Sequence, residues 1–228
     1  MHWCDQLAAI SSHPENISRF YLTPEHKRCN ELVAQWMQDA GMETWVDAAG
    51  NLCGRYDGKN PCAKTLILAS HLDSIPNAGA YDGILGVLVA IAVVEQFYHN
   101  DITLPYAIDI IGFGDEEGTR FGSTLLGSRA VAGTWNPEWW ELKDRNGISL
   151  KQAFIDFGLD PDNIHSAARN PDDLLAYLEV HIEQGPVLEN ENLALGIVTA
   201  IAGARRFSID IEGYAGPAGT VPMPMRTD

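Results

Sequence analysis

The sequence predicts an α/β fold, a central sheet with helices on both faces. Residues 64–70 form a continuous apolar run of strand length, which is typical of a strand covered on both sides. Residues 84–97 are apolar all round and too long for a strand, so they predict a buried helix, and residues 105–114 predict a second central strand. Strands that alternate with helices in this way favour a sheet between two helical layers.

The remaining elements follow from local signals. Residues 23–41 predict a helix, because Thr23 can cap it, Pro24 suits its first turn and Gly41 can end it. Residues 42–56 predict two short strands around an Ala-Gly-Asn turn. Residues 124–132 and 149–158 predict helices. Further strands are expected at 177–180, 194–201 and 205–213, whereas the Trp-rich stretch 135–147 is expected to be a surface excursion whose tryptophans pack locally.

The composition restricts the possible partners. The chain has 228 residues, 46% of them hydrophobic, and a formal net charge of −16. So acidic a protein is a poor match for nucleic acid or an anionic membrane. Its four cysteines form no C-x-x-C pair, residues 84–94 are too short to span a bilayer, and the first ten residues lack a signal-peptide pattern, so a cytoplasmic protein is expected.

Three predicted strands end in histidine or carboxylate residues. The strand at 65–70 leads into His-Leu-Asp, the strand at 106–114 into Asp-Glu-Glu-Gly, and the strand at 177–180 into His-Ile-Glu-Gln-Gly. Ligands of open α/β sheets bind beyond the carboxyl ends of the strands. We therefore expect one rim to gather His71, Asp73, Asp82, Asp115, Glu116, Glu117, His181 and Glu183.

Each motif alone has an ordinary alternative. A histidine at a strand end is usually a plain polar residue, and an acidic triplet is usually a solvated loop or the first turn of a helix. Together, however, adjacent carboxylates repel one another, and bound divalent cations would offset that cost. Imidazole and carboxylate ligands suit Zn²⁺, with Mn²⁺ or Co²⁺ as substitutes, and such ions activate water and polarise carbonyl groups. A neighbouring carboxylate could then act as general base.

Four stretches carry a resemblance to a known family: 71–86, 114–128, 181–189 and 213–228. They resemble the allantoate amidohydrolase and N-carbamoyl-L-amino-acid hydrolase family, within the dinuclear-metal aminoacylase and zinc carboxypeptidase superfamily. The resemblance covers nearly the whole chain, in the same order and spacing. It implies a three-layer α/β/α sandwich with a mixed, mostly parallel sheet, two divalent metal ions (Zn or Mn) and a small ureide or carbamoyl amino acid as substrate.

The resemblance also implies roles for the metal ligands. His71, Asp82 and His181 resemble the ligands of one ion, with Asp82 bridging to a second ion that Glu117 would hold. Glu116 resembles the general base that moves a proton from water to the leaving nitrogen.

Three further residues have supporting roles in this resemblance. Asp73 would orient His71 from behind, as carboxylates commonly do for metal-bound imidazoles. Arg206 stands where the family grips the substrate carboxylate, a role that suits guanidinium, although a surface arginine on a strand is the alternative. Gln184 is expected near the substrate.

Two departures from the family pattern qualify these expectations. Pro217 stands where the family has a histidine that stabilises the reaction intermediate across a dimer, and proline cannot donate that hydrogen bond. Family members are also nearly twice as long, and the remaining histidine ligand of the second ion lies in the additional part. The expected organisation is a catalytic domain at 1–204 and the first strand and loop of a lid or dimerisation domain at 205–228, in a protein that is a homodimer at full length.

Several functions therefore stay open. Hydrolysis of allantoate is the first choice and hydrolysis of an N-carbamoyl-L-amino acid or β-ureidopropionate the second. A non-catalytic chain that binds at most one metal ion is the alternative of another class, which Pro217 favours. A peptidase or aminoacylase of the same superfamily is disfavoured by the His-Ile-Glu-Gln-Gly motif.

Overall fold

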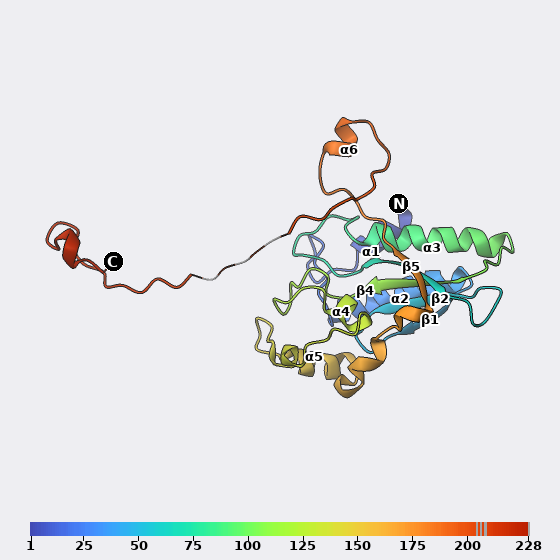
Figure 1. Cartoon of the computed structure of the whole chain (residues 1–228), viewed down its shortest axis with the longest axis horizontal. Helices are drawn as coiled ribbons and strands as arrows, with labels where there is room; N and C mark the ends of the chain where they lie inside the picture. The colour runs from blue at the N-terminus through green and yellow to red at the C-terminus, as the bar shows by residue number, and fades with distance from the viewer. Residues whose placement is uncertain (204, 206, 208, 228) are drawn as a thin grey trace. The chain divides into compact units, whose positions relative to one another are not determined.

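The structure is a computed structural model that describes all of residues 1–228 except 204, 206, 208 and 228. It divides into two compact units, Met1–Gln184 and Gly185–Asp228. The first unit contains a five-stranded sheet and five of the α-helices (Figure 1).

The sheet has the strand order β1-β2-β4-β3-β5. The strands are β1 (Glu43–Val46), β2 (Leu52–Tyr56), β3 (Thr65–His71), β4 (Ala107–Phe113) and β5 (Leu174–Leu178). β3 pairs in parallel with both β4 and β5, whereas β2 is antiparallel to both β1 and β4. Four of the five strands therefore point the same way, and the predicted mixed, mostly parallel sheet is confirmed.

Helices cover both faces of this sheet. On one face, α1 (His2–Ala8), α2 (Pro24–Asp39) and α3 (Ile84–His99) share a core with Ile108 and Ile110 of β4. On the other face, Ile111 and Phe113 of the same strand pack with Val131 of α4 (Leu126–Val131). Successive side chains of a strand point to opposite faces, so one apolar strand serves both cores. The predicted three-layer sandwich is confirmed.

Helix α2 forms for the reasons that its sequence indicates. The hydroxyl of Thr23 accepts a hydrogen bond of 3.2 Å from the backbone N–H of His26, and Pro24 occupies the first turn. Gly41 follows the helix with a φ of +77°, a conformation that glycine adopts without steric cost. The buried side of the helix faces β1 and β2, which places α2 over one end of the sheet.

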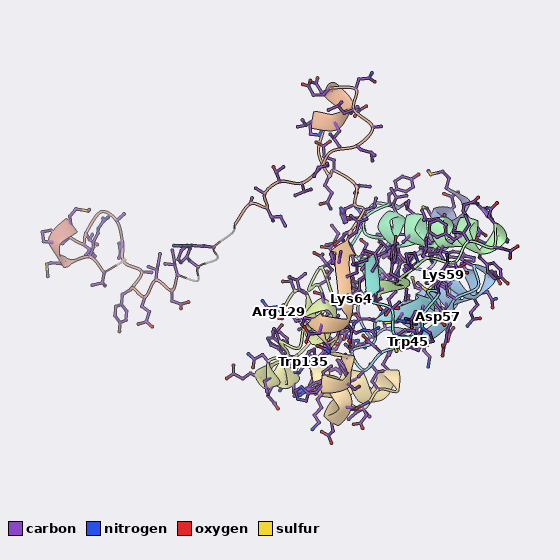
Figure 2. All side chains as sticks on the ribbon, turned by 45° about the vertical axis from the view of Figure 1, so that its right-hand side comes forward. Trp45, Asp57, Lys59, Lys64, Arg129 and Trp135 are labelled. Carbon is purple, nitrogen blue, oxygen red and sulfur yellow. The ribbon has the colours of Figure 1, made fainter. Side chains whose placement is uncertain are left out.

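The Trp-rich excursion packs on itself, as predicted. Trp135 lies 4.8 Å from the ring centre of Trp140 and 5.8 Å from that of Phe154 in α5 (Leu150–Phe157). The short helices η1 (Pro137–Glu141), η2 (Pro161–Ala167) and η3 (Pro171–Asp173) complete this part. Figure 2 shows Trp135 and Arg129 on one side of the unit, away from Lys59 and Asp57 at the other.

The strand predicted at 177–180 begins three residues earlier in the structure. β5 begins at Leu174 and is an edge strand, paired only with β3 among the described residues. Most of its side chains are exposed, including Tyr177 and Leu178. An apolar strand at an edge has the same sequence signal as one in the middle, because the difference lies in what pairs with it.

The second unit contains α6 (Val187–Asn190) and η4 (Met223–Met225). The strands predicted at 194–201 and 205–213 are not formed by the residues described there. Strand formation needs a partner backbone, and apolar side chains such as Ile197 and Ile211 are almost fully exposed here. The functional division at residues 204 and 205 stays a prediction. No helix of the described chain has the length and apolarity needed to cross a bilayer.

Candidate metal centre

His71 ends β3 inside the protein, with 3% of its surface exposed. Its Nδ1 lies 3.0 Å from the backbone carbonyl oxygen of Asp73. A carbonyl oxygen only accepts hydrogen bonds, so Nδ1 is the donor, and in the neutral ring Nε2 is left with a lone pair. Parallel pairing of β3 with β4 brings His71 opposite Phe113, directly before the acidic loop.

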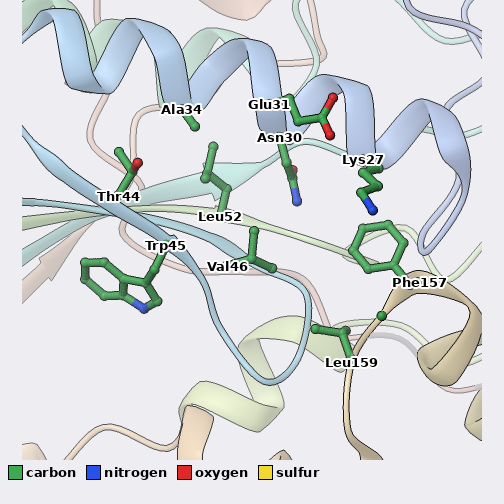
Figure 3. A pocket seen from close by; sticks show the side chains of 11 residues that line it. Lys27, Asn30, Glu31, Ala34, Thr44, Trp45, Val46, Leu52, Phe157 and Leu159 are labelled. Carbon is green, nitrogen blue, oxygen red and sulfur yellow. The ribbon is translucent and has the colours of Figure 1, made fainter.

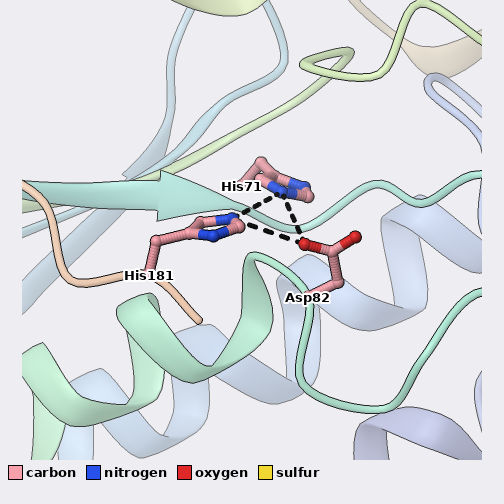
Figure 4. Close-up of side chains that lie close together, drawn as sticks. All are labelled: His71, Asp82 and His181. Atoms are coloured by element: carbon pink, nitrogen blue, oxygen red, sulfur yellow. Dashed lines mark hydrogen bonds and ion pairs between the residues drawn. The ribbon is translucent and has the colours of Figure 1, made fainter. Parts of the chain in front are cut away.

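His181 and Asp82 meet the free nitrogen of His71 (Figure 4). The two Nε2 atoms are 3.5 Å apart, and Asp82 Oδ1 lies 3.4 Å from His181 Nε2 and 3.9 Å from His71 Nε2. The Nδ1 of His181 lies 3.0 Å from the backbone carbonyl oxygen of Ile182, so Nε2 is the acceptor of its neutral ring as well. The prediction that these three side chains converge agrees with this geometry.

The donor set fits a tetrahedral cation. Two nitrogens that each lie about 2.0–2.1 Å from such an ion are about 3.3–3.4 Å apart. The observed separation of the two Nε2 atoms is 3.5 Å. In the neutral rings two lone pairs face each other at this distance and repel, and a bound cation would turn that repulsion into attraction.

Asp73 lies behind the two halves of the site. Its carboxylate accepts the backbone N–H of Glu116 at 3.0 Å and that of Glu117 at 3.2 Å, and one oxygen lies 3.7 Å from His71 Nδ1. Burial raises the pKa of Asp73, while His71 and the two backbone hydrogen bonds act in the opposite direction. Asp73 therefore ties β3 to the loop that follows β4.

Glu116 and Glu117 form a second possible metal group with His71, their nearest ligand atoms lying within 4.8 Å of one another. Burial raises the pKa of Glu117; His71 opposes the rise, and the carboxylates of Glu116, Asp73 and Asp82 add to it. The geometry groups the two glutamates together and does not separate a ligand from a base. Their different roles stay a prediction.

The other predicted residues have varied positions. Gln184 donates a hydrogen bond of 2.9 Å from Nε2 to Asp82 Oδ1. Asp115 is buried and has a φ of +59°, and burial together with the charge of Asp73 raises its pKa well above the usual range. Asp115 and Glu183 belong to neither metal group among the described residues. Arg206 lies outside the described residues, so its role stays a prediction.

Two residues that support the site were not singled out from the sequence. Gly83 has a φ of +67°, and a Cβ there would lie 2.4 Å from the His71 ring. Asn51 accepts the backbone N–H of Gly114 at 3.0 Å and donates to Asp47 and to the carbonyl oxygen of Gly127. The Asp-Gly and Gly-Asn pairs that contain them were visible as turn signals, but the tertiary partners were not.

Comparison with known proteins assigns this chain to a family. The model of peptidase family M20/M25/M40 matches residues 67–226. An N-carbamoyl-L-amino acid amidohydrolase of Geobacillus stearothermophilus is 45% identical over 98% of this chain and 55% of its own length. An allantoate deiminase of Arabidopsis thaliana is 40% identical over 98% of this chain and 43% of its own length.

Solved structures agree. A hydantoinase/carbamoylase family amidase from Burkholderia ambifaria is 33% identical, with a TM-score of 0.79 over 99% of this chain and 54% of that one. AtUAH in complex with (S)-hydroxyglycine is 34% identical, with a TM-score of 0.83 over 99% of this chain and 55% of that one. This chain spans about half the length of the curated relatives that it matches. The relative from Geobacillus stearothermophilus is named as an amidohydrolase. This chain belongs to peptidase family M20/M25/M40.

Proposed function

We propose that the whole protein is a metal-dependent amidohydrolase that cleaves the C–N bond of a carbamoyl or ureido group. The observation that carries the proposal is the convergence of His71 Nε2, His181 Nε2 and Asp82 Oδ1, with separations of 3.4–3.9 Å. Family membership and the names of the relatives support the type of bond.

His71, Asp82 and His181 would hold one divalent ion, Zn²⁺ or Mn²⁺, and Asp82 would bridge to a second ion held by Glu117. A divalent ion in such a site acts as a Lewis acid toward the substrate carbonyl oxygen. Gln184 supports the arrangement by donating to the same Asp82 oxygen that faces the histidines. The number of ions and their identity are part of the proposal.

Glu116 would move the proton. In this proposal its carboxylate takes a proton from water and delivers it to the leaving nitrogen, which then departs as ammonia or an amine. Asp73 positions Glu116 by accepting its backbone N–H, and it fixes the neighbouring Glu117 in the same way. The two glutamates are thereby held on one short loop with separate tasks.

The substrate would be a ureido or carbamoyl compound with a carboxylate, which Arg206 would bind. Allantoate is favoured by the motifs and by several relatives named as allantoate deiminases, at 39–40% identity. N-carbamoyl-L-amino acids are the second candidate, favoured by the 45% identical amidohydrolase of Geobacillus stearothermophilus. A homodimer in the cytoplasm is the expected setting of the activity.

The test is ammonia release by the whole protein with allantoate and with N-carbamoyl-L-leucine, in the presence of added Zn²⁺ or Mn²⁺. We expect turnover of one of the two and its loss in Asp82→Asn, with normal activity in Asp156→Asn, whose carboxylate is exposed on α5. Hydrolysis of a dipeptide or an N-acetyl amino acid instead of both ureides would contradict the proposal.

A further inference from the structure

A pocket lies away from the metal centre, between α2, β1 and the residues that follow α5. Its volume is about 430 Å³, within the range of about 300–1,000 Å³ that is common for small-molecule sites. It shares no residue with the two metal groups. The walls include the apolar side chains of Trp45, Val46, Leu52, Phe157 and Leu159 (Figure 3).

One buried polar side chain, Asn30, lies behind the wall of the pocket. Asn30 is 3% exposed, and its Nδ2 donates to the carbonyl oxygen of Gly50 at 3.2 Å. Its Oδ1 has no hydrogen-bond partner among the described residues. Figure 3 shows the Asn30 side chain extending from α2 toward the pocket. Buried acceptors without a partner are rare, because their desolvation is costly, but this oxygen is enclosed by protein atoms and does not reach the pocket surface. Asn30 therefore anchors α2 to Gly50 behind the pocket and offers a ligand no acceptor.

Two opposite charges stand beside Asn30 on the same helix. Lys27 and Glu31 both line the pocket, one helical turn apart, and both are exposed. Within the described part of the chain, neither takes part in an ion pair, whereas Glu25 and Arg28 of the same helix pair with each other at 3.3 Å. The pocket therefore presents one cation and one anion beside an apolar wall.

The wall is held in place before any ligand arrives. The ring of Phe157 stacks on the buried ring of His26 at 5.2 Å and 23°. Gly158 follows α5 with a φ of +98°, and the backbone N–H of Leu159 donates to the carbonyl oxygen of Phe154 at 2.9 Å. A site whose walls are fixed in this way loses little conformational entropy on binding.

We propose that this pocket binds a free α-amino acid with an apolar side chain. The α-carboxylate would face Lys27, the α-ammonium group would face Glu31, and the side chain would lie against Trp45, Leu52 and Phe157. Both charges are then satisfied by one small zwitterion. The site is separate from the proposed hydrolytic function and does not depend on it.

Calorimetric titration of the chain with L-leucine tests the proposal. We expect saturable binding that Lys27→Gln and Glu31→Gln each weaken by about three- to tenfold, while Lys151→Gln, an exposed lysine outside the pocket, has no effect. Isocaproate and isoamylamine, which each lack one of the two charged groups, should bind more weakly. Lys27→Gln should not weaken isoamylamine further, and Glu31→Gln should not weaken isocaproate further.

Two outcomes would overturn the proposal. One is the absence of leucine binding at millimolar concentrations to the wild-type chain. The other is binding that survives both charge variants but disappears in His71→Ala, which would locate the amino acid at the metal centre. Ala34→Phe supplies an independent check, because it fills the pocket from α2 without removing a charge and should abolish binding.

Discussion

The Nε2 atoms of His71 and His181 face each other at 3.5 Å although the residues are separated by 110 positions in the chain. Each ring directs its Nδ1–H at a backbone carbonyl oxygen, so in the neutral rings two lone pairs face each other with Asp82 Oδ1 beside them. Two neutral rings of these tautomers form no hydrogen bond with each other. The arrangement suits a cation that both nitrogens and the Asp82 carboxylate can bind.

The first prediction concerns metal and stability. Addition of Zn²⁺ to metal-free chain should raise the free energy of unfolding, by about 2.7 kcal/mol when free metal is a hundredfold above the dissociation constant. His181→Ala and Asp82→Asn should lose this increase. His165→Ala, which removes an exposed histidine of η2, should keep it. Thermal unfolding with and without a chelator measures the difference; an equal increase in all variants would place the metal elsewhere.

The second prediction separates the two glutamates. Glu117→Ala should weaken metal retention, because it removes a proposed ligand. Glu116→Ala should retain the metal and lower the turnover of the whole protein by about 10²–10⁴, the usual contribution of a general base. Metal content after dialysis, together with initial rates, tests this division. Equal metal loss in the two variants would show that the assignment of roles is wrong.

The third prediction concerns Gly83. Gly83→Ala should cost about 1–3 kcal/mol for its backbone strain at positive φ and also displace the His71 ring, which a Cβ would approach to 2.4 Å. Gly147→Ala is the matched control: its φ is +79°, but no atom lies within 4 Å of the added carbon. Both variants should therefore lose stability, whereas only Gly83→Ala should lose metal affinity. Similar metal affinity in the two would remove Gly83 from the supporting structure of the site.

The fourth prediction is a pH dependence of stability. Burial lowers the pKa of His26 from 6.5 to about 3, and the charge of Arg19 adds to the effect. Between about pH 3 and pH 6.5 the unfolded chain therefore binds a proton at His26, whereas the folded chain does not. This difference lowers the free energy of unfolding as the pH falls below about 6.5. The slope approaches about 1.4 kcal/mol per pH unit.

The measurement is the denaturation midpoint between pH 7 and pH 5 for the wild type and for His26→Asn, which keeps an acceptor for the backbone N–H of Leu22. The variant should lose the slope due to His26. His165→Asn, at an exposed position, should keep it. Parallel curves for the wild type and His26→Asn would contradict the buried, neutral state of this histidine.

The sequence predicted those features that depend on local pattern. The caps of α2, the apolar runs of β3 and β4 and the turn between β1 and β2 all lie where the residues indicate. The convergence of His71 with His181 also followed from a general property of parallel strands, whose carboxyl ends share an edge. The sequence did not predict tertiary partners, because these depend on segments that are distant in the chain. Examples are the edge position of β5, the contact of Gly83 with His71 and the hydrogen bond between Asn51 and Gly114.

The last prediction concerns the exposed apolar residues of the second unit. Phe207, Ile209 and Ile211 alternate with polar positions, and each is at least 79% exposed. A segment with this pattern can pair with an extended segment of another chain, since its apolar side chains share one face once a partner backbone is present. We therefore expect the 228-residue chain to self-associate.

Ile209→Lys combined with Ile211→Lys should lower the average mass measured by light scattering toward that of one chain. Asp210→Lys is the control, because it adds positive charge to the same segment on the alternate face and should leave the association in place. If all three proteins have the mass of a single chain, the segment has no tendency to pair; if the control dissociates as fully as the double variant, charge and not the apolar face governs the association.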